Sequence, residues 1–326
     1  MKSGKLNWDD LKGLINNNKS VKRDEVRVRN GVGEDCSVID FGEYECVIST
    51  DPITGAAENI GRLAVHVNCN DVASCGVEPL AILVTILAPE DTTYEEINEI
   101  MRQIDEETSK INVEIIGGHT EITTAVNRIV VSCTVLGKCI SGRAVSTAGA
   151  QVGDDIIVTK NLALEGTNII VNDKYERIKK VLTEEEIDEA REYINKISVI
   201  MEGKISGEFG VNCMHDITEG GVLGALWELA DAANLGFKVY EDRMPISVVT
   251  RKVCKEFNID PLRLISSGSM IITTKNGESL VNLLKENGIN STIIGKITED
   301  KGILVKLSEG EVIVPQPERD ELFSIY

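Results

Sequence analysis

The amino-acid sequence predicts two domains, each of which combines helices and strands. The chain of 326 residues is longer than one hydrophobic core usually supports. Strand and helix patterns alternate as far as residue 136, and several short strands follow residue 269. Between residues 142 and 153 the pattern loosens into small side chains, which is typical of a domain boundary. We therefore expect an N-terminal arm over 1–29, a first domain over 30–148 and a second over 149–326.

The composition narrows the class of protein. Apolar residues make up 42% of the chain, so both domains can bury a core. The formal charge of -19 repels nucleic acid and anionic membranes, and neither is expected as a partner. Eight cysteines are scattered without a Cys-x-x-Cys pair, as in proteins of a reducing compartment. No signal-peptide core opens the sequence and no window reaches about 18 apolar residues, so we expect a soluble cytoplasmic protein.

Each expected element rests on a local pattern. Apolar residues at helical spacing predict a helix leading to Asp71. Thr93 and Glu96 form a capping box that opens another helix, and Thr183 and Glu186 open a third that continues to residue 201. The expected strands are 45–49, 81–87, 113–116, 128–136, 155–159, 269–274, 291–297, 303–306 and 311–314, with a further helix over 278–287.

A polar patch at residues 68–71 is the first candidate site. Asn68, Asn70 and Asp71 stand between apolar segments, where polar side chains need a partner. A carboxylate beside two amides suits a hard cation such as Mg²⁺, which binds oxygen and leaves positions for phosphate oxygens. Taken alone, Asp71 fits a helix or turn cap equally well.

Carboxylates recur where other apolar segments meet turns. Glycines at 31 and 33 permit a tight turn just before Glu34 and Asp35, although a plain β-turn would use the same residues. Asp51 follows a strand that Pro52 is expected to end. Such a position at a strand end is suited to a ligand-binding residue.

Two glycine pairs stand beside further acidic residues. Gly117 and Gly118, followed by His119 and Glu121, are expected at a strand end, where glycine lets the backbone approach a ligand. The alternative is a Gly-Gly turn with solvated side chains.

In the second half, His215, Asp216 and Thr218 crowd the start of an apolar helix, where free N–H groups favour phosphate. Asp216 and Glu219 also fit a plain cap, but Gly220 and Gly221 would weaken a first turn and capping does not explain them.

Together the carboxylates predict one acidic site. Several carboxylates that converge cannot all remain ionised without cations, so Mg²⁺ carrying a nucleotide triphosphate is the natural occupant. The sequence contains neither a Gly-x-x-x-x-Gly-Lys-Ser/Thr loop nor a dinucleotide fingerprint. The nucleotide would therefore be held mainly through metal and backbone groups.

In this order the motifs resemble the superfamily of aminoimidazole ribonucleotide (AIR) synthetase, selenophosphate synthetase, thiamine-monophosphate kinase and the hydrogenase maturation protein HypE. They are Gly-Val-Gly-Glu-Asp-Cys-Ser-Val, Ser-Thr-Asp, Asn-Asp-Val-Ala-Ser-Cys-Gly-Val-Glu-Pro, Gly-Gly-His-Thr-Glu and His-Asp-Ile-Thr-Glu-Gly-Gly. The resemblance implies an α/β N-terminal domain whose mixed sheet pairs with a second subunit, an α+β C-terminal domain, and ATP with Mg²⁺ between them. It also implies a homodimer.

The resemblance implies roles for individual residues. The metal ligands would be Asp35, Asp51, Asp71, Asp216, Glu34 and Glu121. The nucleotide would contact Gly33, Thr50, Asn68, Gly117, Gly118, Thr218, Gly220 and Gly221. Asp71, Asp216 and His119 are the candidate catalytic residues.

Three functions remain open from the sequence. The first is a HypE-like enzyme that uses ATP to phosphorylate an oxygen of a small-molecule or protein-borne acceptor. HypE acts through a C-terminal cysteine, whereas this chain ends Leu-Phe-Ser-Ile-Tyr326, so we expect a different acceptor. The second is a phosphotransferase resembling thiamine-monophosphate kinase, whose Gly-Gly-Asp-Thr motif is Gly-Gly-His-Thr here. The third is a non-catalytic, nucleotide-binding maturation partner.

Overall fold

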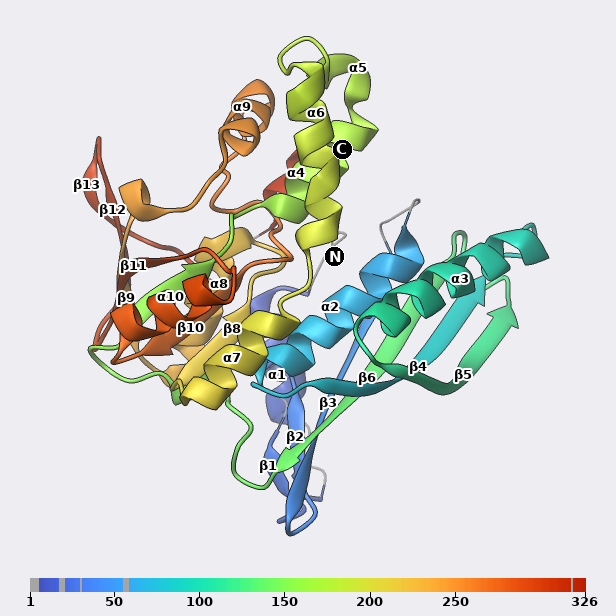
Figure 1. The fold of residues 1–326 in the computed structure, drawn as a ribbon, viewed down its shortest axis with the longest axis horizontal. Coiled ribbons are helices and arrows are strands. Elements are labelled where there is room, and N and C mark those ends of the chain that lie inside the picture. Colours follow the sequence, from blue (N-terminus) through green and yellow to red (C-terminus); the bar gives the residue numbers. More distant parts are fainter. Residues whose placement is uncertain (1–5, 18–20, 30, 55–58, 318) are drawn as a thin grey trace.

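The protein folds around two mixed β-sheets (Figure 1). The computed structural model describes residues 6–17, 21–29, 31–54, 59–317 and 319–326. The arm expected over 1–29 lies partly outside these residues. Its described part contains helix α1 (Trp8–Asn17) and strand β1 (Val26–Val28). Two sheets with helices packed against them confirm the predicted two-domain fold, although the domain boundaries stay a prediction.

The first sheet has the strand order β1-β2-β3-β6-β4-β5. Its strands are antiparallel except for the parallel pair of β4 and β5, which the crossover helix α3 makes possible. Helix α2 packs on β3 and β6, and α3 packs on α2 (Figure 1). The remaining elements are β2 (Ser37–Asp40), β3 (Tyr44–Ile53), α2 (Ile60–Ser74), β4 (Pro79–Ala88), α3 (Tyr94–Lys110), β5 (Glu114–Ile122) and β6 (Val130–Ile140).

The second sheet has the order β13-β12-β9-β11-β7-β10-β8, so β8 is an edge strand. Its strands are β7 (Asp155–Thr159), β8 (Cys213–Asp216), β9 (Gly236–Tyr240), β10 (Met270–Thr274), β11 (Ser291–Thr298), β12 (Gly302–Lys306) and β13 (Gly310–Ile313). The helices of this half are α4 (Leu164–Asp173), α5 (Tyr175–Ile178), α6 (Glu184–Arg191), α7 (Ile200–Phe209), α8 (Gly221–Ala233), α9 (Val248–Phe257) and α10 (Gly277–Glu286).

Helices α2 and α7 join the two halves through closely packed backbones. A Cβ atom on Gly203 would lie 2.1 Å from the carbonyl oxygen of Ala73, and one on Gly207 would lie 2.8 Å from Gly76. The amide of Asn70 extends the seam, because it donates to the carbonyl of Ile197 at 2.8 Å and accepts from the backbone N–H of Val199 at 2.9 Å. Asn70 is therefore a structural link between the halves.

Most expected elements are present, including both capping boxes. The helix expected from Thr183 to residue 201 is wrong, since the chain forms α6, a short 3-10 segment over Glu192–Lys196 and then α7. The expected end of a strand at Pro52 is also wrong, because β3 continues to Ile53. Proline is tolerated there because β2 pairs only as far as Ile48, so no neighbour on that edge needs the missing N–H.

The strand end expected at Gly117 and Gly118 is wrong as well, and so is the alternative of a Gly-Gly turn, since both residues lie inside β5. Their φ angles of 148° and 150° favour glycine. A Cβ atom on Gly118 would lie 1.8 Å from the carbonyl oxygen of Val84 on β4. Close pairing of two parallel strands therefore explains these glycines.

Candidate functional site

Four aspartates from distant parts of the chain converge. Asp35 lies in the turn before β2, Asp51 in β3, Asp71 in α2 and Asp216 at the end of β8. Burial, followed by the charges of Asp216, Asp51 and Asp35, raises the pKa of Asp71 well above its usual range. Both halves of the chain therefore contribute carboxylates to one electrostatically coupled cluster.

Serine and asparagine side chains fix two of these aspartates. The hydroxyl of Ser49 donates to Oδ2 of Asp71 at 2.5 Å. Asn68 is buried in α2, where its Oδ1 accepts the backbone N–H of Asp51 at 2.7 Å and its Nδ2 donates to the carbonyl of Asp51 at 3.3 Å. Asn68 thus replaces the missing strand partner of β3 and positions Asp51.

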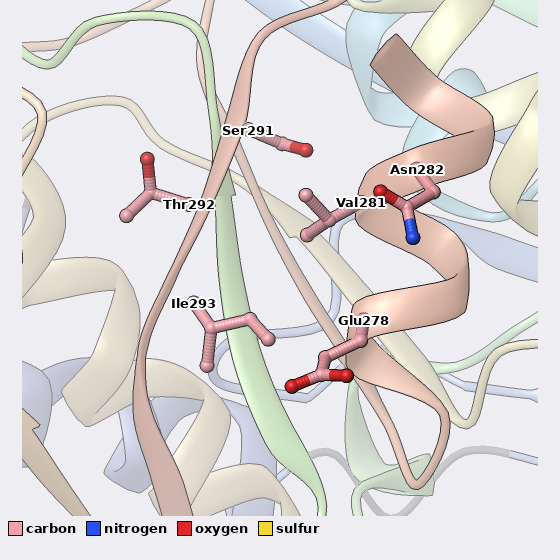
Figure 2. A pocket seen from close by; sticks show the side chains of 6 residues that line it. All are labelled: Glu278, Val281, Asn282, Ser291, Thr292 and Ile293. Carbon is pink, nitrogen blue, oxygen red and sulfur yellow. The ribbon is translucent and has the colours of Figure 1, made fainter. Parts of the chain in front are cut away.

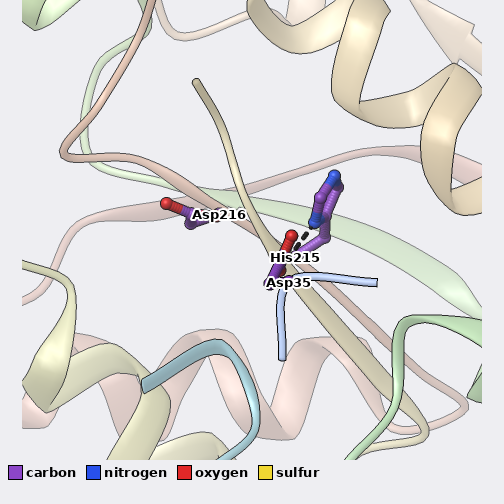
Figure 3. Close-up of side chains that lie close together, drawn as sticks. All are labelled: Asp35, His215 and Asp216. Atoms are coloured by element: carbon purple, nitrogen blue, oxygen red, sulfur yellow. Dashed lines mark hydrogen bonds and ion pairs between the residues drawn. The ribbon is translucent and has the colours of Figure 1, made fainter. Parts of the chain in front are cut away.

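His215 connects Asp35 with a carboxylate that the sequence patterns had not indicated. Its Nδ1 lies 2.8 Å from Oδ2 of Asp35, the contact drawn in Figure 3. Its Nε2 lies 2.6 Å from Oε2 of Glu228 on α8. Ser74 also donates to Oδ2 of Asp35, at 2.8 Å. Burial opposes a charge on the imidazole, but the charges and hydrogen bonds of Asp35 and Glu228 outweigh it and raise the pKa of His215 well above its usual value.

The cluster fits a hard divalent cation. Single ligand atoms of Asp35, His215 and Asp216 lie within 4.8 Å of one another. Both ring nitrogens of His215 already face carboxylates, so the donors available to an ion are the carboxylate oxygens, which Mg²⁺ prefers. Asp71 lies beside them, and its pKa is raised first by burial and then by the charges of the other aspartates, which a cation would offset.

Glu34 and Gly33 have structural partners. The carboxylate of Glu34 accepts hydrogen bonds from the hydroxyl of Ser146 at 2.6 Å and from the backbone N–H groups of Thr147 and Ala148. It therefore binds the segment between the two sheets. Gly33 has a φ of 83°, and a Cβ atom on it would lie 2.8 Å from the carbonyl oxygen of Glu228. Packing alone accounts for this glycine.

The remaining first-half candidates are Thr50, which directly precedes Asp51 in β3, and four residues of β5. The side chain of Thr50 is exposed and donates to the carbonyl of Cys133 at 2.9 Å. Gly117, Gly118, His119 and Glu121 lie on β5, which β6 and β4 separate from the Asp51 strand. The side chains of His119 and Glu121 are 67% and 54% exposed. Within one chain, the structure does not bring these residues to the cluster.

The start of α8 is engaged by the chain's own C-terminal segment. Gly220 adopts a φ of 84°, and its backbone N–H donates to Oδ2 of Asp320 at 2.6 Å. A Cβ atom on Gly221 would lie 2.6 Å from the carbonyl oxygen of Leu262. The backbone carbonyl of Thr218 accepts from the N–H groups of Gly221 and Ser266. Helix capping did not explain Gly220 and Gly221. Backbone conformation and close packing explain both.

An open groove of about 410 Å³ lies elsewhere, between α10 and β11 (Figure 2). Strands β7 and β10 separate β11 from β8, so the groove is remote from Asp216. Among the described residues, no helix is long and apolar enough to cross a membrane.

Two mixed sheets with aspartates gathered from both define a two-domain protein with a candidate metal centre at the junction. The chain belongs to the AIR synthase-related proteins. The family's N-terminal domain matches residues 33–139, and its C-terminal domain matches residues 151–308. This confirms the family resemblance drawn from the motifs.

Individual relatives refine the comparison. The chain is 30% identical to a putative hydrogenase expression/formation protein of Methanocaldococcus jannaschii, covering 98% of this chain and 96% of the relative. It is 25% identical to a thiamine-monophosphate kinase of Pyrococcus horikoshii, covering 85% and 86%. The fold is similar to that of the hydrogenase maturation protein HypE in complex with ATP, with a TM-score of 0.69, 17% identity and coverage of 95% and 91%.

Proposed function

We propose that this protein uses ATP and Mg²⁺ to phosphorylate an oxygen atom of an acceptor molecule, as an enzyme of the AIR synthase-related family. The observation that carries the proposal is the convergence of Asp35, Asp51, Asp71 and Asp216. The imidazole of His215 contacts this cluster, but its other ring nitrogen is already paired with the carboxylate of Glu228. An excess of negative charge in a partly closed site favours a divalent cation.

The residues of the chain take distinct parts in this proposal. Asp35, Asp71 and Asp216 would hold Mg²⁺, and Asp51, fixed by Asn68 at the exposed end of the cluster, would face the solvent side of the ion. Bound Mg²⁺ would offset the phosphate charge during transfer. Ser49 and Ser74 keep the carboxylates oriented, so the site needs little rearrangement when it is loaded.

The relatives favour two reaction types. The similarity to a putative hydrogenase expression/formation protein over nearly the whole chain favours a HypE-like reaction in maturation, in which a carbonyl-type or carboxyl-type oxygen is activated. The similarity to a thiamine-monophosphate kinase supports the second candidate, in which phosphate remains on the acceptor. A non-catalytic nucleotide-binding partner is the third.

We also propose a homodimer formed through the first sheet. Helices α2 and α3 cover one face of this sheet, whereas the opposite face carries exposed apolar side chains. Leu83 on β4 is 37% exposed, and Ile116 on the edge strand β5 is 51% exposed. Exposed apolar side chains beside an open edge favour burial against a second copy.

Product analysis tests the reaction. Purified protein is incubated with Mg²⁺, γ-labelled ATP and panels of amide, carboxylate and phosphate-ester acceptors. Release of inorganic phosphate that depends on an amide or carboxylate supports the HypE-like reaction, and label on the acceptor supports the kinase. ATP binding without turnover on any acceptor would leave only the non-catalytic role. Absence of binding would contradict all three.

A further inference from the structure

Glu228 forms a buried contact that the proposed chemistry does not require. Its Oε2 lies 2.6 Å from Nε2 of His215, and Nδ1 of that ring lies 2.8 Å from Oδ2 of Asp35. The side chains of His215 and Glu228 are only 3% and 7% exposed. Burying a carboxylate in the apolar helix α8 is costly unless it is paired, so this contact needs an explanation.

The contact spans both halves of the protein. Asp35 belongs to the first sheet's region, whereas His215 on β8 and Glu228 on α8 belong to the second. The turn that precedes Asp35 also rests on α8, because Gly33 leaves no room for a Cβ atom against the carbonyl oxygen of Glu228. Figure 3 shows the imidazole extending to one side of β8 with Asp35 beside it, while Asp216 points to the other side.

We propose that Glu228 is a positioning residue for the metal site. It fixes the ring of His215, and the ring holds Oδ2 of Asp35 so that the carboxylate faces Asp71 and Asp216. The inference rests on the proposed function, since it concerns the affinity for Mg²⁺. Partners that orient metal ligands from outside the coordination sphere typically contribute 10- to 100-fold in metal affinity.

A second buried histidine–glutamate pair supplies the control. Nε2 of His66 lies 3.0 Å from Oε2 of Glu107, whose other oxygen, Oε1, accepts from Arg62 and Lys110. This pair joins α2 to α3 and contacts none of the four aspartates among the interactions described. If Glu228 served stability alone, its substitution would behave like that of Glu107.

The test titrates a nonhydrolysable ATP analogue by calorimetry into full-length protein at a series of Mg²⁺ concentrations, and the Mg²⁺ affinity is taken from the Mg²⁺ dependence of analogue binding. Glu228→Gln keeps the size of the side chain but removes its charge, and it is expected to weaken Mg²⁺ binding by about 10- to 100-fold. Glu107→Gln is expected to lower the melting temperature while leaving the Mg²⁺ affinity unchanged. Unchanged Mg²⁺ affinity in Glu228→Gln would overturn the inference.

A second variant decides the matter if Glu228→Gln does not fold. The hydroxyl oxygen of Ser74 lies 2.8 Å from the same Oδ2 of Asp35 and 2.6 Å from the backbone carbonyl oxygen of Asp71, and Ser74→Ala removes both contacts without removing a charge. It is expected to weaken Mg²⁺ binding, and unchanged affinity would show that the orientation of Asp35 does not matter. Failure of the wild-type protein to bind Mg²⁺ with the analogue would instead contradict the proposed function.

Discussion

Individual residues at the site show a conflict between stability and function. Asp71 is 5% exposed and lies beside three other carboxylates, so its charged form is unfavourable in the folded protein. Within the described part of the chain, the hydroxyl of Ser49 is the side-chain group that donates to this carboxylate. Because the buried charge of Asp71 destabilises the folded protein, we expect this side chain to bind a ligand.

Asp71→Asn should therefore stabilise the empty protein and abolish Mg²⁺-dependent nucleotide binding. Because the folded-state pKa of Asp71 is raised, its ionisation opposes folding as the pH rises above the ordinary range of a carboxyl group. At pH 7 the variant should have a higher melting temperature than the wild type. The expected rise is about 2–4 °C for each kcal/mol by which the substitution increases the free energy of unfolding. The difference should shrink as the pH falls, and scanning calorimetry at several pH values measures both. A lower melting temperature at pH 7 would contradict this reading.

Glu107 should have the opposite effect on stability. The hydrogen bond from His66 is the largest influence that lowers the pKa of Glu107, to about 2, against burial, which raises it. Its contribution to stability is therefore present above the ordinary carboxyl pKa and is lost as the pH falls toward about 2. Glu107→Gln should lose roughly 1–3 kcal/mol at neutral pH. Urea denaturation at pH 7 and pH 3 should show the gap closing at the lower pH.

The sequence predicted the four aspartates because each was expected where an apolar segment meets a turn, although the structure places Asp51 inside β3 and Asp71 inside α2. Glu228 was not predicted as a site residue because it lies within α8. A lone acidic residue among Val222, Leu226 and Leu229 is nevertheless a signal in the sequence that could have indicated it. Asn68 was expected to contact nucleotide, but its bonds to Asp51 depend on the open edge of β3, and strand pairing is not visible in a local pattern.

At the scale of elements, the seam between α2 and α7 joins the two halves of the protein that contribute the four aspartates. Local patterns could not reveal this seam, since the glycines of α7 resemble those of any weak helix. They also could not show that α6 and α7 are separate helices, because the apolar spacing continues across the 3-10 segment between them.

Gly203→Ala should destabilise the protein by about 1–3 kcal/mol, because the new methyl group would meet the carbonyl of Ala73. Gly13→Ala on α1 is the matched control, since no atom lies within 4 Å of its added Cβ and alanine favours a helix. Chemical denaturation of both variants compares them. Equal stability of Gly203→Ala and the wild type would show that the helices separate freely.

At the scale of the whole molecule, the proposed dimer would form through the exposed face of the first sheet. Dimerisation there would also place the β5 residues His119 and Glu121 at a subunit boundary. The sequence motifs grouped them with the site, but the strand order keeps them from it within one chain.

Leu83→Asp should convert the proposed dimer to a monomer, because a charge on the apolar face cannot be buried without a partner. Val248→Asp is the control, since Val248 is also exposed, at 67%, but lies on α9. Light scattering after size-exclusion chromatography gives the mass of each. A monomeric wild type, or an unchanged mass in Leu83→Asp, would contradict the proposed interface.

The most direct test of nucleotide binding through a metal ion is the melting temperature of the wild-type protein with ATP, measured once with Mg²⁺ and once with a chelator. The account predicts a rise in melting temperature with millimolar ATP and Mg²⁺, its loss with the chelator, and its absence in Asp35→Asn and Asp216→Asn. Protection that persists with the chelator, or in those variants, would show that the aspartate cluster does not bind the nucleotide through a metal ion.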